Sequence, residues 1–114
     1  MNHVQRPEVL LKVNDKEYKA NCSLSVCENI EKELQKGIMS LAKDLMEGNL
    51  LLPTAITILR ISIRGGGNDI DGKVLRSELN NLGYMGTIKL AGSVLTKCLD
   101  TGQTDEEKKT EVPE

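Results

Sequence analysis

The chain has 114 residues, a formal net charge of −2 and 28% charged residues, a composition that suits one domain with a modest core. Two tyrosines are its only aromatic residues besides one histidine, so we expect an aliphatic core. The near-neutral charge and the scarcity of aromatic rings argue against a nucleic-acid-binding protein, which usually presents a basic face or stacking rings.

The cysteine pattern favours a reducing compartment. The chain has three cysteines, and its sequence shows neither a signal-peptide pattern nor an apolar stretch of membrane length, so we expect a cytoplasmic protein without membrane association. Cys27 and Cys98 fall on the apolar faces of expected helices, where a thiol behaves as a small hydrophobe. The spacing of Cys22 and Cys27 does not suit a zinc site. His3 is expected to be solvated and not a ligand.

The N-terminal part of the chain predicts a β-hairpin. Residues 7–13, PEVLLKV, favour a strand, Asn14 and Asp15 favour a turn, and residues 17–20 favour the returning strand. Because a two-stranded hairpin is marginally stable alone, we expect it to pack on the apolar faces of the helices that follow.

Two short helices are predicted next. Ser25 and Glu28 have the spacing of a capping box, so Ser25 is the expected N-cap of a helix that ends at Gly37. A second helix is predicted over residues 38–47, with Gly48 as its stop. Its expected buried face consists of Ile38, Leu41, Ala42 and Leu45.

The pattern of the third helix is the most ambiguous one. Its β-branched isoleucines favour a strand, but a strand would put Arg60 on the apolar face. Pro53 suits the first turn of a helix, and Gly65 suits its C-terminal stop. We therefore predict a helix whose buried stripe is Ala55, Ile56, Leu59 and Ile63.

The last two helices complete a mainly α-helical α+β fold. Asp71 is the expected N-cap of a helix ending at Leu82, and Thr87 the expected N-cap of the fifth helix. The buried stripe of the fifth helix is predicted to be Ile88, Ala91, Val94, Leu95, Cys98 and Leu99. We expect one domain over residues 1–100, with the N-terminal hairpin packed on a bundle of about five short helices. Residues 101–114 are charged and predict a disordered tail.

Residues 67–78, GNDIDGKVLRSE, have the spacing of an EF-hand calcium loop. Asp69, Asp71 and Glu78 occupy ligand positions three, five and twelve. Gly67, however, replaces the acidic residue of position one. A glycine-rich linker followed by an Asp-capped helix is the favoured interpretation, so we predict no metal site and no cofactor, and a calcium-binding module remains an alternative.

No arrangement of residues predicts catalysis. The single histidine is terminal, so Cys–His and Ser–His pairs have no base. Arg64 followed by Gly65, Gly66 and Gly67 invites a phosphate-loop interpretation but lacks the Lys-Ser pair. We therefore expect a protein that is not an enzyme.

Apolar residues outside the expected stripes are the candidates for partner binding. Met39 and Met46 flank the stripe of the second helix, Leu51 lies in the following link, and Ile58 and Ile61 point away from the stripe of the third helix. The alternative is that the third helix is buried on both sides.

Over residues 8–100, the chain resembles the tail assembly chaperones of the gene-transfer-agent type. The resemblance rests on the hairpin, a Glu-containing helix over residues 29–37, the step Glu47-Gly48-Asn49-Leu50, and a helix closing with Arg and glycines at residues 64–67. A Leu-rich helix and a last amphipathic helix follow. The chain departs from the family at Asp15, where the family's turn usually has glycine, and in the many isoleucines of the third helix.

This resemblance implies a phage or prophage protein that acts during tail assembly in the bacterial cytoplasm. Its partners would be the tape-measure protein and the tail-tube protein, with a homo-oligomer possible. Binding would mask apolar helix stripes by a helix-in-groove contact, without chemistry or cofactor. A small structural protein of the phage tail is the alternative that the same resemblance leaves open.

Overall fold

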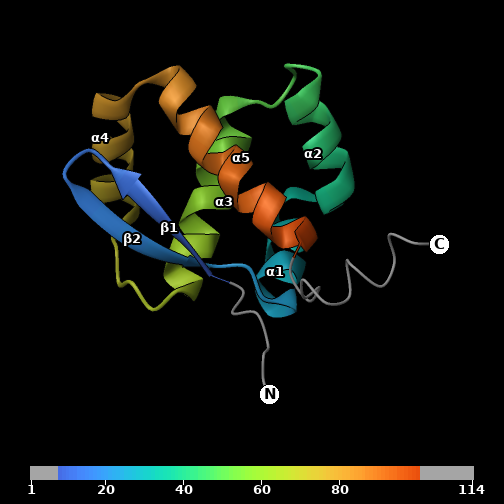
Figure 1. The fold of residues 1–114 in the computed structure, drawn as a ribbon, viewed down its shortest axis with the longest axis horizontal. Helices are drawn as coiled ribbons and strands as arrows, with labels where there is room; N and C mark the ends of the chain where they lie inside the picture. The colour runs from blue at the N-terminus through green and yellow to red at the C-terminus, as the bar shows by residue number, and fades with distance from the viewer. Residues whose placement is uncertain (1–7, 101–114) are drawn as a thin grey trace, which may run out of the picture.

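The structure is a computed structural model that describes residues 8–100 as an antiparallel hairpin and five helices, which confirms the predicted mainly α-helical α+β fold (Figure 1). The expected tail over residues 101–114 and His3 lie outside the described residues. The elements are β1 (Glu8–Val13), β2 (Lys16–Asn21), α1 (Leu24–Leu34), α2 (Ile38–Met46), α3 (Leu52–Gly65), α4 (Gly72–Leu82) and α5 (Tyr84–Asp100).

The hairpin turns where the sequence predicts. Val13 pairs with Lys16 across a two-residue turn, and Asn14 takes a positive φ of 59°, a conformation that asparagine tolerates well. Leu11, Val13 and Ala20 are buried. The hairpin packs against α3, α4 and α5, which supply the apolar support that an isolated hairpin lacks.

Helix α3 is the central element, in contact with the hairpin, α1, α4 and α5. The prediction of a helix is confirmed, but the predicted stripe was wrong in one respect: Ile56 is only half-buried, and Ile58 is fully buried. Burial on several sides explains the difference, because a helix enclosed by neighbours buries more than one stripe. The buried residues of α3 are Ala55, Ile58, Leu59, Ser62 and Ile63.

Helix α1 begins and ends earlier than predicted. Its N-cap is Ser23, whose hydroxyl accepts a hydrogen bond from the Val26 amide at 3.4 Å, so the predicted cap at Ser25 was wrong. The backbone amide of Ser23 is itself held at 2.6 Å by the Asn21 side-chain oxygen. The helix ends at Leu34, and Gly37, the predicted stop, is the N-cap of α2.

Helices α4 and α5 follow each other with almost no link. The Asp71 carboxylate accepts a hydrogen bond from the Lys73 amide at 3.0 Å, which confirms the predicted cap of α4. Helix α5 begins at Tyr84, directly after Gly83, so the predicted start at Thr87 was wrong. The buried Thr87 hydroxyl instead donates to the carbonyl oxygen of Gly83, the residue before the helix, at 2.8 Å.

Helix α5 is the longest helix among the described residues and packs against α3, α2, α4 and β1. In Figure 1 it crosses the front of the bundle, with the hairpin on its left and α2 on its right. The elements within residues 8–100 leave one side of α5 partly open, and this side carries the groove described next.

Candidate partner-binding groove

A groove of about 760 Å³ runs along α5, bounded by the end of α2, the link that follows it and the start of β1. We call it the α5 groove. On the α5 side, lining residues recur every three or four positions. They are Met85, Ile88, Gly92, Thr96 and Asp100. This spacing is one continuous face of a helix, roughly 22 Å long at 1.5 Å per residue.

The walls of the groove are apolar. Leu45 from α2 and Leu50 from the following link stand beside α5, and Val9 from β1 lines it as well. Gly92 on the floor lets α2 come close: a β-carbon at this position would lie 3.0 Å from a methyl group of Leu45. The missing side chain therefore allows the two helices to approach and keeps the floor of the groove low.

The N-terminal end of the groove exposes large apolar side chains. Tyr84 and Met85 both line the groove at the N-terminal end of α5. Tyr84 is 57% exposed and Met85 is 62% exposed. Tyr84 also borders a second, smaller hollow between α3, α4 and α5. Exposed Met and Tyr beside a hollow are typical of protein-binding surfaces, where a flexible or amphipathic side chain meets a partner.

The charged side chains that line the groove are mostly basic. Lys89 and Lys97 lie along α5, and Asp100 lies at its C-terminal end. Lys97 also takes part in an interaction within the protein. The groove thus combines apolar walls with a small excess of positive charge, which favours a partner that carries acidic residues beside its apolar ones.

Three of the five residues predicted for partner binding are strongly exposed: Met39 (76%), Met46 (85%) and Leu51 (67%). Ile58 is not available on the surface of the folded protein because it is fully buried in the core, so its assignment to a partner surface was wrong. Ile61 is half-buried and lines a separate, more polar depression between α1 and α3.

The exposed candidates do not share one surface with the α5 groove. Met39 and Met46 are seven residues apart, so they lie on the same side of α2, whereas the groove is lined by Leu45. Leu51 follows the wall residue Leu50 directly in the chain. The groove-lining face of α5 was missed by sequence reasoning, although the apolar residue Met85, outside the predicted buried stripe, was a signal for it.

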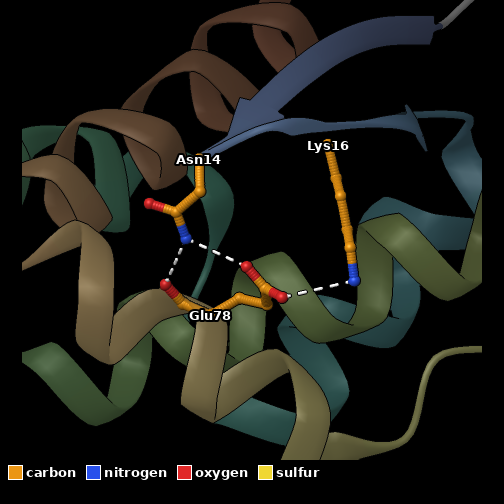
Figure 2. A network of polar contacts seen from close by, with 3 residues as sticks. All are labelled: Asn14, Lys16 and Glu78. Carbon is orange, nitrogen blue, oxygen red and sulfur yellow. Dashed lines mark hydrogen bonds and ion pairs between the residues drawn. The ribbon is translucent and has the colours of Figure 1, made fainter.

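The EF-hand-like loop is used for structure. Asp71 caps α4. The Glu78 carboxylate accepts a hydrogen bond from the Asn14 side-chain amide at 2.9 Å and forms an ion pair with Lys16 at 3.3 Å (Figure 2). The same Asn14 amide donates to the Glu78 backbone oxygen at 2.9 Å. These bonds lower the pKa of Glu78, with the Asn14 bond as the largest cause. Glu78 therefore joins the tip of the hairpin to α4.

Asp69, the remaining candidate ligand of this loop, lies in the link between α3 and α4. Across residues 8–100, no three His, Cys, Asp or Glu side chains are arranged to hold a metal ion. None of the helices within that range is both long and apolar enough to cross a membrane.

Comparisons with known proteins give no relative for this chain: no family model, no curated protein and no solved structure matches it.

Proposed function

We propose that the protein is a tail assembly chaperone of a phage or prophage, related to those of gene transfer agents, and that it holds a helical segment of a tail protein in the α5 groove. The sequence resemblance over residues 8–100 suggests the class of protein. The observation that carries the binding role is the groove itself: a continuous helix face between apolar walls that no element of the described chain covers.

The shape of the groove suits a helix. Its α5 face is roughly 22 Å long, which corresponds to about 15 residues or four turns of a partner helix. The small residues Gly92 and Ser93 leave room on the floor of the groove. The axis of a partner helix can therefore lie at the usual distance of roughly 8–10 Å from the axis of α5. Met85, Lys89, Ser93 and Thr96 are exposed, so the groove is open to solvent along its length.

The lining predicts the sequence character of the partner. Met85 and Ile88 would contact apolar residues spaced three or four apart, and Lys89 would lie opposite an acidic residue. A long helical tape-measure protein presents such amphipathic stripes before assembly. Covering the stripe would keep it from aggregating until tail-tube subunits arrive, and no bond is made or broken in the process.

The experiment is a calorimetric titration of the protein with fragments of the tape-measure and tail-tube proteins encoded beside it. Met85→Glu places a charge at the apolar end of the groove and should weaken binding by about tenfold or more, equivalent to about 1.4 kcal/mol. Met39→Glu is the matched control, since Met39 is also strongly exposed, at 76% against 62% for Met85, on a helix outside the groove.

Two results would count against the proposal in different ways. If neither tail protein binds the unaltered chain, the chaperone function fails. If one binds but both variants lose affinity equally, the function stands and the α5 groove is the wrong site, because the outer side of α2 would then contribute as much.

A further inference from the structure

All three cysteines of the chain come together at one place in the fold, although Cys98 is far from Cys22 and Cys27 in sequence. Cys22 lies between β2 and α1, Cys27 in the first turns of α1, and Cys98 in the last turn of α5. Sequence reasoning expected Cys27 and Cys98 on buried helix faces, and both are indeed half-buried against the core. It did not predict that they would meet Cys22.

The contacts place the Cys22 thiol against the helix turn that carries Cys98. The Cys22 Sγ donates a hydrogen bond to the Val94 carbonyl oxygen at 3.7 Å, and Val94 precedes Cys98 by one turn on the same side of α5. The Cys98 thiol therefore lies within interaction distance of the Cys22 sulfur. The Cys27 Sγ donates a hydrogen bond to the Cys22 carbonyl oxygen at 3.6 Å, and Cys27 also lies within reach of the Cys98 thiol.

The three thiols differ in access and acidity. Cys22 is fully buried, whereas Cys98 and Cys27 are partly exposed. The hydrogen bond from Cys98 lowers the pKa of Cys22, and the positive charge of Lys97 acts in the same direction. Donating that bond raises the pKa of Cys98, and burial raises the pKa of Cys27. An accessible sulfur therefore lies beside a buried one that gives up its proton more readily.

We propose that Cys22 and Cys98 are a redox pair that forms a reversible intramolecular disulfide when the protein meets a peroxide. This inference is independent of the function proposed for the α5 groove. It concerns thiols that are free in the structure and that neither the groove nor the tether at Glu78 uses.

The reaction takes two steps. Once the pair has lost one proton to solvent, the remaining Cys98 proton passes to the Cys22 sulfur and the Cys98 sulfur attacks one oxygen of hydrogen peroxide. A sulfur–oxygen bond forms, the oxygen–oxygen bond breaks, and the leaving hydroxide takes a proton from solvent to give water and a sulfenic acid at Cys98. The Cys22 sulfur then attacks the Cys98 sulfur, the sulfur–oxygen bond breaks, and a second water leaves with the Cys22 proton. Two thiols are oxidised by two electrons and the peroxide is reduced to two waters.

The disulfide would join the junction of β2 and α1 to the end of α5. It closes a loop over most of the described chain, and long loops give the largest stabilisation by restricting the unfolded state. The oxidised protein should therefore melt at a higher temperature than the reduced one, and dithiothreitol should reverse the change.

The test uses the full, fully reduced chain, treated with hydrogen peroxide, alkylated and mapped by peptide mass spectrometry without reduction. The expected product has lost the mass of two hydrogens, contains the Cys22–Cys98 link, and carries the alkyl label on Cys27. The same reaction in concentrated urea is the control. In the unfolded chain the short loop between Cys22 and Cys27 closes most easily, so that pair should dominate there.

Variants separate a redox pair from chance oxidation. Cys27→Ser should still form the cross-link, and Cys98→Ser, a change at a partly exposed position, should abolish it. A Cys22–Cys27 or a Cys27–Cys98 link as the main product of the folded protein would overturn the proposal. So would sulfinic acid at Cys98 without a cross-link, or disulfide-linked dimers as the main product. These outcomes are read from the unaltered chain, so they do not depend on how well a variant folds.

Discussion

Replacing Gly66 by alanine should destabilise the protein through a clash between the end of α3 and strand β2. Gly66 has φ −82° and ψ 4°, a conformation open to alanine, so backbone strain does not contribute. A β-carbon there would lie 1.8 Å from the Lys19 carbonyl oxygen and 3.3 Å from the Ala20 Cα. Because the nearest atoms belong to backbone, the strand and the helix end must move apart by more than an ångström.

The cost can be worked out from the groups that must move. Overpacking of this kind costs about 1–3 kcal/mol. Moving Lys19 also strains the 2.8 Å hydrogen bond from the Asn68 side chain to the Lys19 oxygen, which contributes about 1 kcal/mol. The lower flexibility of alanine in the unfolded chain offsets about 0.4–1 kcal/mol. We expect Gly66→Ala to lower the free energy of unfolding by roughly 1–3.5 kcal/mol in total.

Urea unfolding followed by circular dichroism measures this loss, with Gly72→Ala as the matched control. A β-carbon at Gly72 meets no atom within 4 Å, and this residue opens α4, so alanine should be neutral or slightly stabilising. If Gly66→Ala unfolds within about 0.5 kcal/mol of the unaltered protein, the packing of β2 on the end of α3 is not as described.

Three further predictions follow from the core and from Glu78. Ile58→Ala should lower the free energy of unfolding by about 2–4 kcal/mol, and Ile61→Ala by clearly less, because only Ile58 is fully buried; equal losses in urea unfolding would contradict this. The Asn14 bond lowers the pKa of Glu78 in the folded state below its ordinary value of 4.5. The stabilisation from the ionised Glu78 carboxylate is therefore present above that value and disappears as the pH falls through the lowered pKa. Glu78→Gln should flatten the acid side of a plot of unfolding free energy against pH, measured from about pH 3 to 6. An unchanged slope would count against the link from Glu78 to Asn14 and Lys16. Calcium should not bind in the micromolar range, because Gly67 offers no carboxylate at the first position of the loop; a saturable calorimetric signal that Glu78→Gln removes would show the opposite.

The existence and order of the elements could be predicted from local chemistry. Pro53 and Asp71 mark helix starts by properties of their own backbone and side chain, and the structure uses them near the predicted places. The caps at Ser25 and Thr87 were wrong because another start was available a few residues earlier. Contacts made in the folded protein determine which of two nearby residues becomes the N-cap. For α1, the hydrogen bond from the Ser23 amide to the Asn21 side chain is such a contact.

The buried face of α3 could not be predicted for a different reason. Isoleucine stands at positions on every side of this helix, so hydrophobicity alone does not distinguish Ile56 from Ile58. Only the positions of the hairpin, α1 and α5 around the helix determine which isoleucine is enclosed. The same limit applied to the α5 groove, which exists because α2 ends beside α5, a contact between segments far apart in the chain.

The central claim is that a helical partner binds in the α5 groove. The most direct measurement is the change in amide chemical shifts of the ¹⁵N-labelled protein on titration with a tape-measure fragment. We predict that the shifts concentrate on residues 84–100 and on the wall residues Leu45 and Leu50. Shifts confined to the outer side of α2 around Met39, or to the polar depression between α1 and α3, would contradict the claim.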